Sequence, residues 1–342
     1  MKVTDTSEGG FESSIVESLV TEAGYARGRS KDYLPKFSVD IQKLQAFLEA
    51  TQPDTAAQLS FDPDSPAGQK FLNRIRSEVT KRGVIDVLLN GVKHNAHTID
   101  LYYATPSAKN DTAAEQHAQN IFSVTRQLHF SINNAKQSLD LCVMINGLPV
   151  ATGEVKNKLT HQNVNEAIEQ YKTDRDPNEH IFKFGVCAVH FALDEREVMM
   201  CTHLKGKSSW FLPFNKGHND GAGNPPNPYG YPVDYLWRDI LTKPRLTDIL
   251  ENYARKIEEV DKKTNKKKEV QIFPRWHQLA AVRQLVKDVH QKGIGQRYLI
   301  QHSTGSGKSN SITWLAIQLA GLEKDGEHMV DTVIIVTDRR VL

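Results

Sequence analysis

The order of apolar and polar positions along the chain predicts helices first and strands after them. Apolar residues recur at a helical period over residues 11–25, 37–51 and 67–81. From residue 84 the pattern changes to short runs rich in β-branched and aromatic residues, which are typical of strands. These runs cover residues 84–89, 99–103, 122–130, 139–145, 150–156, 182–193 and 197–204. The pattern therefore predicts a domain of the mixed α/β class.

The second half of the chain predicts a boundary between two domains. Residues 163–172 and 236–256 are expected to be helical, and the Gly-, Pro- and Asn-rich segment 217–232 is a long loop. Loops of this length are often functional. Residues 262–268 contain five lysines and no apolar residue, which favours a solvated linker over a DNA-contacting patch.

Beyond this linker the pattern alternates between helix and strand, as in a parallel sheet. Helices are expected over 276–291 and 309–320, and strands over 298–301 and 332–337. The predicted organisation is a first domain over residues 1–255, a lysine-rich linker over 256–270 and the start of a second domain over 271–342.

Composition limits the possible classes of protein but does not indicate a function. A length of 342 residues predicts about two domains. The net charge of +2 gives no global sign of a nucleic-acid binder, so a basic surface has to be local. The three cysteines have neither metal-binding nor disulfide spacing, which favours reduced thiols. The chain has neither a targeting signal nor an apolar run long enough to span a bilayer, so we expect a soluble, cytoplasmic protein without a membrane partner.

The strongest local motif is a phosphate-binding loop over residues 302–309. Its glycines let successive backbone N–H groups point at one phosphate, and the following helix adds its dipole. The lysine reaches the β- and γ-phosphates, and the serine after it is a ligand of Mg²⁺. We therefore expect ATP with Mg²⁺ to be bound by Thr304, Gly305, Ser306, Gly307, Lys308 and Ser309. The loop begins with His302, where the general pattern has Gly or Ala.

Residues upstream of this loop resemble the corresponding region of superfamily 2 helicases. In these helicases an aromatic residue and then a glutamine precede the loop, and the amide of Gln278 is suited to pair with the adenine edge. The loop is expected to lie in an incomplete RecA-like P-loop domain, since neither an acidic box nor a second motor domain follows it.

A second motif combines Asp140 with Glu154-Val155-Lys156 on two predicted strands. An aspartate followed by Glu-x-Lys is the pattern of PD-(D/E)xK nucleases. Two carboxylates and a backbone carbonyl, here that of Val155, form a plausible Mg²⁺ site because Mg²⁺ prefers oxygen ligands. Lys156 shares a strand face with Glu154 and would orient or activate the attacking water. The proline expected before the aspartate is replaced by Leu139. The competing interpretation of Glu154 and Lys156 alone is an exposed, ion-paired strand end.

Taken together, the chain resembles the restriction (R) subunit of type I restriction–modification enzymes. The resemblance rests on residues 140–149, 154–157, 167–171, 211–217, 221–228, 275–278 and 302–309. It implies a RecB-like nuclease fold, with a mixed sheet flanked by helices, joined to a DNA-translocating motor. It also implies double-stranded DNA as substrate, with modification and specificity subunits as partners.

The resemblance adds two site residues. Gln170 falls at the place of a phosphate or water contact on the helix after the lysine. The tyrosine expected four residues later is Asp174, and the nearest tyrosine is Tyr171. Glu12 on the first helix matches a metal-site glutamate, with a solvent-facing helix charge as the alternative.

The expected function is a Mg²⁺-dependent endonuclease coupled to ATP-driven translocation. The alternative is a helicase or translocase fragment whose nuclease-like domain only binds DNA or a partner.

The hairpin between the two acidic strands gives a prediction about register. Asn146-Gly147 favours a two-residue type I′ turn. That turn alone would place Asp140 and Glu154 on opposite faces, because a one-residue shift moves every side chain to the other face. We therefore expect an odd-length loop or a bulge. A three-residue loop would place Asp140 opposite Thr152 and diagonal to Glu154.

Overall fold

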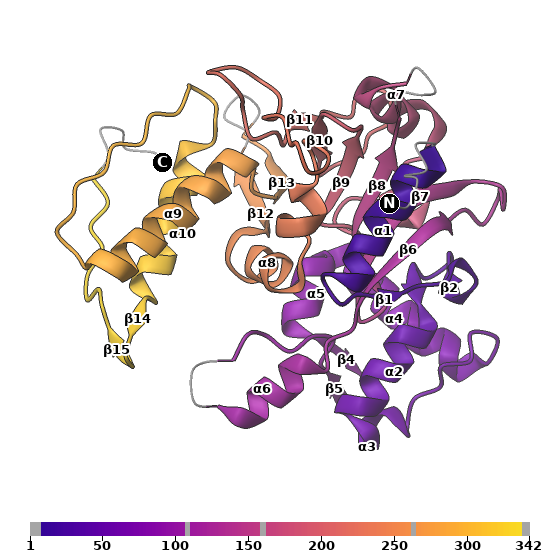
Figure 1. Cartoon of the computed structure of the whole chain (residues 1–342). Coiled ribbons are helices and arrows are strands. Elements are labelled where there is room, and N and C mark those ends of the chain that lie inside the picture. Colours follow the sequence, from indigo (N-terminus) through magenta and orange to yellow (C-terminus); the bar gives the residue numbers. More distant parts are fainter. Residues whose placement is uncertain (1–7, 107–109, 158–161, 261–264, 337–342) are drawn as a thin grey trace. The chain divides into compact units, whose positions relative to one another are not determined.

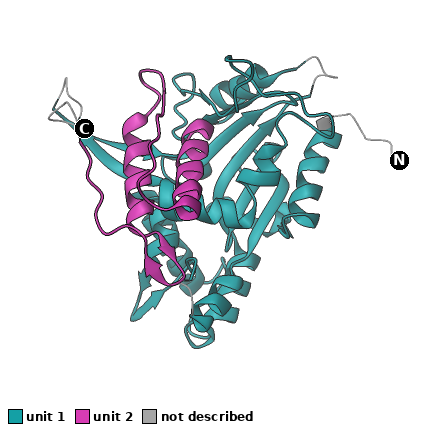
Figure 2. Ribbon diagram, turned by 60° about the vertical axis from the view of Figure 1, so that its left-hand side comes forward, with its two compact units in different colours: residues 1–273 teal, residues 274–342 magenta. Residues whose placement is uncertain are grey.

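The computed structural model describes residues 8–106, 110–157, 162–260 and 265–336. The chain divides into two compact units, Met1–Phe273 and Pro274–Leu342 (Figure 2). No helix within the described ranges is both long and apolar enough to cross a membrane. All three cysteines are buried and none forms a disulfide.

Unit 1 is built on a mixed seven-stranded sheet in the order β1-β6-β7-β8-β9-β10-β11 (Figure 1). Neighbouring strands are antiparallel except for the pairs β1–β6 and β8–β9, which are parallel. The strands are β1 (Ala26–Arg27), β6 (Phe122–His129), β7 (Ser138–Ile145), β8 (Leu148–Val155), β9 (Val189–Leu193), β10 (Val198–Cys201) and β11 (Leu212–Pro213). The predicted hairpin across residues 194–196 is confirmed as β9–β10.

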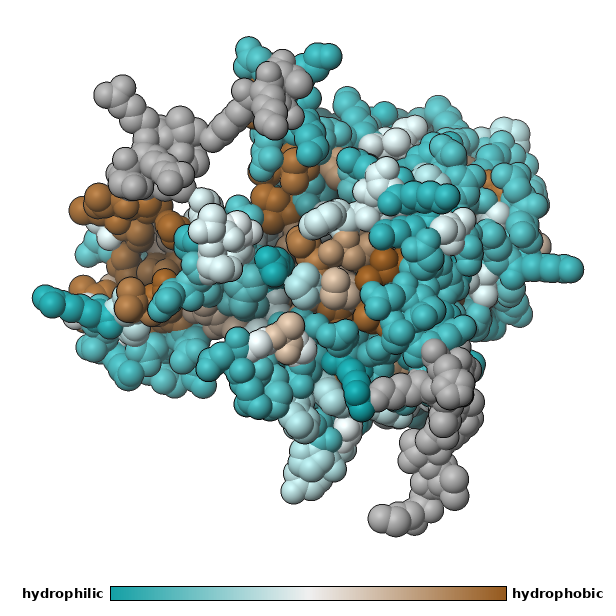
Figure 3. All heavy atoms as spheres, turned by 90° about the horizontal axis from the view of Figure 1, so that it is seen from above, coloured by the Kyte–Doolittle hydropathy of each residue, from teal (hydrophilic) through white to brown (hydrophobic). Residues whose placement is uncertain are grey.

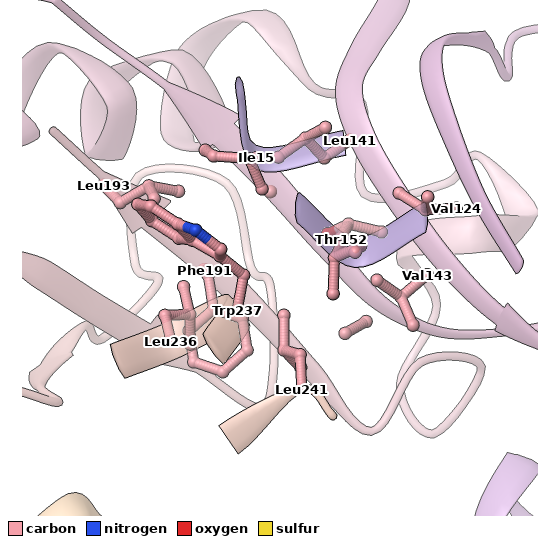
Figure 4. Close-up of a pocket in the computed structure, with 13 residues that line it drawn as sticks. Ile15, Val124, Leu141, Val143, Thr152, Phe191, Leu193, Leu236, Trp237 and Leu241 are labelled. Atoms are coloured by element: carbon pink, nitrogen blue, oxygen red, sulfur yellow. The ribbon is translucent and has the colours of Figure 1, made fainter. Parts of the chain in front are cut away.

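Helices cover both faces of this sheet, which confirms the predicted fold class. Helix α1 (Glu8–Thr21) and the π-helix η5 (Leu236–Ile240) cover one face. In Figure 4, Ile15 and Trp237 surround a small hollow together with Leu141 and Val143 of the sheet. On the other face, α7 (Val164–Glu169) and the π-helix η3 (Gln170–Asp174) pack on Cys142 and Met144.

The remaining elements of unit 1 lie mainly between α1 and β6 in the sequence. The helices are α2 (Ile41–Thr51), α3 (Pro53–Ala56), α4 (Pro66–Arg82), α5 (Val84–Asn90), α6 (Asp111–Ala118) and α8 (Lys243–Asp248), with η1 (Ser30–Asp32), η4 (His180–Phe182) and η6 (Ile249–Tyr253). Short strand pairs are β2 (Tyr33–Leu34) with β3 (Val39–Asp40) and β4 (Val92–His94) with β5 (His97–Ile99). The three predicted N-terminal helices and the helix after β8 are present.

Three predicted strands of unit 1 are wrong or too long. Residues 84–89 form helix α5, because Gly83 with φ +88° ends α4 and allows a new helix to start directly after it. The buried residues Val84, Ile85, Val87 and Leu88 line one side of that helix. A short apolar run of this kind cannot be assigned to helix or strand by periodicity alone. The strand expected over 99–103 already ends at Ile99, and the strand expected over 182–193 begins only at Val189.

The predicted linker over 256–270 is replaced in its described residues by a β-hairpin. Strands β12 (Arg255–Val260) and β13 (Lys267–Ile272) pair antiparallel, and the hairpin belongs to unit 1. Cross-strand ion pairs join Lys256 to Glu269 and Lys267 to Glu258, each at 2.8 Å. Because an exposed hairpin can pair opposite charges across its strands, it needs few apolar residues. The expected helix 236–256 consists of the three shorter helices η5, α8 and η6.

The β7–β8 hairpin combines the favoured turn with a bulge. Asn146 (φ +50°) and Gly147 (φ +83°) form a two-residue turn with both residues left-handed, as type I′ requires. The register then shifts between Val143 and Met144, because β8 has one extra residue. Beyond this bulge Leu141 pairs with Gly153, so Asp140 comes opposite Glu154. The predicted bulge is confirmed, whereas the three-residue loop and the diagonal placement are wrong.

Unit 2 has helices α9 (Trp276–Lys292) and α10 (Lys308–Ala320) and the short pair β14 (Glu323–Lys324) and β15 (Glu327–His328). Within the described part of this unit, residues 298–301 and 332–336 form no strand, so those two predictions are wrong. A strand requires a neighbour to bond its N–H and C=O groups. Neither segment has such a neighbour here, and Leu299 and Ile334 remain 94% and 81% exposed. Apolar side chains of this unit contribute to the brown surface on the left of Figure 3.

Candidate functional site

The two predicted metal-binding carboxylates lie together, opposite each other on β7 and β8. Asp140 is 6% exposed and Glu154 is fully buried. The Val155 N–H donates to Asp140 Oδ2 at 2.8 Å, which joins the two strands through a side chain. An exposed strand end, the competing interpretation, is therefore wrong for Glu154.

Glu154 forms a buried ion pair with Arg175, a residue that the sequence pattern did not single out. Arg175 Nε donates to Glu154 Oε1 at 2.6 Å, and Arg175 Nη2 donates to the Ser138 carbonyl at 2.8 Å. The guanidinium also lies 5.4 Å from the centre of the Phe130 ring. Arg175 follows directly after η3, so only the path of the chain after α7 brings it to the site.

The second oxygen of Glu154 differs from the first in its hydrogen bonding. Glu154 Oε2 is buried and makes no hydrogen bond to any residue that the structure describes. Burial raises the pKa of the Glu154 carboxyl well above its ordinary value, and the nearby charge of Asp140 raises it further. The Arg175 guanidinium opposes both effects. This oxygen is consequently available to a cation.

Arg175→Met is expected to destabilise unit 1 by about 3–5 kcal/mol, because it leaves a buried carboxylate without its partner. Urea denaturation followed by circular dichroism measures this free energy. The double variant Arg175→Met/Glu154→Gln should recover most of the loss, since it removes the unpaired charge. Arg27→Met is the matched control: Arg27 and its partner Glu17 are 56% and 61% exposed, and such pairs contribute about 1 kcal/mol or less. Equal denaturation midpoints for Arg175→Met and the unchanged chain would contradict the prediction.

Glu12 lies beside Asp140 and does not face solvent. Its side chain is almost fully buried and accepts hydrogen bonds from Arg126 Nε at 2.8 Å and from Gln127 Nε2 at 2.9 Å. Gln127 Nε2 also donates to Asp140 Oδ1 at 3.1 Å. Burial raises the pKa of the Glu12 carboxyl, and Asp140 adds to this effect. The alternative interpretation of Glu12 as a solvent-facing charge is wrong.

The other residues considered for the site differ in their burial and in their hydrogen bonds. Lys156 is 8% exposed and lies directly after the end of β8, two residues beyond Glu154. Gln170 is half-buried at the start of η3, and it has no hydrogen bond to Asp140 or Glu154 within the described ranges. Tyr171 is fully buried, and its hydroxyl forms a 2.7 Å hydrogen bond with Thr152 Oγ1. Tyr171 therefore supports β8 from within the core.

The residues present fit a hard divalent cation. The described residues contain no ready cluster of three or more His, Cys, Asp or Glu side chains with metal-ligand geometry. Asp140 and Glu154 nevertheless offer carboxylate oxygens, and the buried, unpartnered Glu154 Oε2 is the kind of atom that a cation satisfies. The hollow in Figure 4 is lined mainly by apolar side chains on the other sheet face and includes neither carboxylate.

The phosphate-binding loop of unit 2 has the backbone that its glycines predict. Gly305 and Gly307 have φ of +76° and +83°, and α10 begins at Lys308. Lys308 Nζ donates to the carbonyls of His302 and Ser303 at 3.1 and 2.9 Å. Thr304 and Ser309 are exposed, whereas Ser306 is buried.

Gln278 is placed against this loop. Its Nε2 donates to the Gly307 carbonyl at 2.9 Å, and its Oε1 accepts from the Arg275 N–H at 2.9 Å. Each end of the amide therefore has one protein partner, which leaves one N–H and one oxygen lone pair of this buried side chain for a further hydrogen bond. His277 Nε2 lies 3.1 Å from the Ser306 carbonyl, so two successive residues of α9 brace the loop.

Two known protein families match the chain, one in each of its two units. The family model described as type I restriction enzyme R protein N terminus matches residues 5–209. The model of the SWI2/SNF2 ATPase matches residues 277–342. No individual curated protein matches the chain. Since the first model covers more than half of the sequence, including the strands that hold Asp140 and Glu154, the chain belongs to the type I restriction enzyme R protein N-terminal family, a family of restriction nucleases, and continues into a SWI2/SNF2-type ATPase region.

Proposed function

We propose that unit 1 is a Mg²⁺-dependent endonuclease that cuts double-stranded DNA, and that unit 2 begins an ATP-driven DNA translocase. The observation that supports the nuclease proposal is the close pairing of two buried carboxylates, Asp140 and Glu154, opposite each other across the hairpin, with no hydrogen-bond donor to Glu154 Oε2 among the described residues. Two adjacent buried carboxylates repel each other, and a divalent cation between them would offset that repulsion.

Asp140, Glu154 and the Val155 carbonyl are the groups that would hold the cation. In an antiparallel ladder the N–H and C=O of one residue point to the same side of the strand. Because the Val155 N–H donates to Asp140, the Val155 carbonyl is directed toward β7 as well. When bound, the cation would polarise the scissile phosphate and lower the pKa of a water molecule.

The chain's own residues would orient the reactants around that centre. The ion pair with Arg175 fixes Glu154 through one oxygen and leaves the other for the cation. Lys156, directly after β8, would orient the attacking water, and Gln170, at the start of η3, would contact a phosphate or a water. Bulk water is kept away from Glu154, because its side chain is fully buried.

The proposal is tested with the full-length subunit assembled with modification and specificity subunits on supercoiled DNA that contains a recognition site. With ATP and Mg²⁺ we expect nicked and then linear DNA. Removing the divalent cation with a chelator should stop cleavage, and restoring Mg²⁺ should recover it. DNA that is bound under all conditions but never cut with Mg²⁺ would instead support the alternative, a nuclease-like binding module.

A further inference from the structure

Gln127 has a backbone conformation that its position in a strand does not explain. Its φ is +51°, in the left-handed region, although it lies within β6. Its neighbours pair regularly with β7, Arg126 with Leu141 and Leu128 with Leu139. A left-handed residue that is neither Gly, Asn nor Asp is strained, and such strain is retained mainly where the surrounding structure or function requires it.

The consequence of this conformation is the placement of the Gln127 side chain between two carboxylates. Its single Nε2 donates to Glu12 Oε2 at 2.9 Å and to Asp140 Oδ1 at 3.1 Å. A primary amide has two N–H hydrogens, so one group can serve both acceptors. Two buried carboxylates repel each other, and a shared donor reduces the cost of keeping them adjacent.

The orientation of this amide is itself fixed. Ser138 Oγ lies 2.7 Å from Gln127 Oε1 and donates to it, which directs the NH₂ end toward the carboxylates. The Ser138 carbonyl accepts from Arg175, the partner of Glu154. The first residue of β7 thus connects the group that holds Asp140 to the group that holds Glu154.

We propose that Gln127 is a positioning residue: its amide orients the carboxylate of Asp140 in the cation site on β7 and β8 and holds the carboxylate of Glu12 beside it. This inference rests on the proposed function, since it assumes that Asp140 and Glu154 bind a divalent cation. It accounts for the strained backbone, for the two hydrogen bonds to carboxylates and for the burial of Glu12 far from β7 in the sequence.

Gln127→Gly separates this role from a contribution to folding. Glycine adopts a positive φ without strain, so the variant removes the amide while it relieves the backbone. We expect Mn²⁺ binding to the 342-residue chain, measured by electron paramagnetic resonance, to weaken by about 10–100-fold, as is usual when a group that orients a metal ligand is lost. The thermal midpoint without metal should fall by no more than a few degrees.

Two further variants keep the test decisive. Asn95→Gly makes the same kind of backbone change at another residue with positive φ, in the exposed β4–β5 turn, and should not alter Mn²⁺ affinity. Ser138→Ala removes the hydroxyl that orients the amide but keeps the carbonyl that binds Arg175, and it should weaken Mn²⁺ binding several-fold. If Gln127→Gly fails to fold, the Mn²⁺ affinity of Ser138→Ala tests the inference in its place.

The failure of this inference differs from the failure of the proposed function. If the unchanged chain binds Mn²⁺, Asp140→Asn abolishes binding, and both Gln127→Gly and Ser138→Ala bind as well as the unchanged chain, Gln127 has no positioning role. If Asp140→Asn leaves Mn²⁺ binding unchanged, the cation site on β7 and β8 is itself wrong.

Discussion

Asp140→Asn is expected to reduce DNA cleavage by the assembled restriction complex by about 10³-fold or more, because cation stabilisation of the reacting phosphate contributes several kcal/mol to such reactions. The substitution removes the negative charge. It also replaces one of the two carboxylate oxygens, both of which accept hydrogen bonds, by an NH₂ group, which can only donate. The new NH₂ group then faces a second donor, either the amide of Gln127 or the N–H of Val155, and that hydrogen bond is lost. The carboxylate pair that binds the cation is lost.

The fold should survive this change. Asp140 raises the pKa of the neighbouring Glu154 carboxyl by repulsion, so its neutralisation relieves an unfavourable interaction. Cleavage is measured as the rate at which supercoiled DNA is nicked and linearised. ATP hydrolysis in the same samples shows that the complex has assembled. Glu115→Gln, an exposed carboxylate on α6, is the matched control and should cut at the normal rate. A normal rate for Asp140→Asn would remove this residue from the site.

Lys308→Ala is expected to abolish ATP hydrolysis and translocation by the full-length subunit. In the structure the Lys308 ammonium lies over the loop, bonded to the carbonyls of His302 and Ser303, where it can reach the β- and γ-phosphates of a nucleotide. Its removal takes away the one side-chain cation of the loop without altering the glycines that shape it. We expect the rate of ATP hydrolysis to fall to background in a phosphate-release assay.

The control for this variant is Lys287→Ala, which removes an exposed lysine on α9 in the same unit. It should hydrolyse ATP normally. The thermal unfolding of unit 1 should be the same in both variants, because the core of that unit is formed by its own sheet and helices. ATP hydrolysis at the normal rate in Lys308→Ala would refute the assignment of the loop.

The sequence by itself predicted the strands that carry the two candidate carboxylates. Alternating and continuous apolar runs identified β6, β7 and β8, and with them the strand positions of Asp140 and Glu154, with Lys156 directly after the end of β8. The glycines of the phosphate-binding loop likewise predicted its left-handed backbone. These features are local, so composition and spacing over a few residues are sufficient to identify them.

Local signals failed where a segment depends on its neighbours. The apolar run 84–89 became a helix because Gly83 allowed it to start directly after α4, and residues 298–301 formed no strand because no described neighbour pairs with them. The lysine-rich segment 256–270 is predicted to be a linker, but most of its residues lie in the β12–β13 hairpin, in which ion pairs join the two strands.

The geometry of the site was decided by the tertiary structure. The sequence required a bulge or an odd loop between Asp140 and Glu154, but only the folded sheet showed that β8 takes the extra residue and brings the two side chains directly opposite. Arg175 and Gln127 reach the carboxylates from other parts of the chain. Their roles could not be predicted, because a buried charge needs whichever partner the fold brings close, and spacing along the sequence does not reveal that partner.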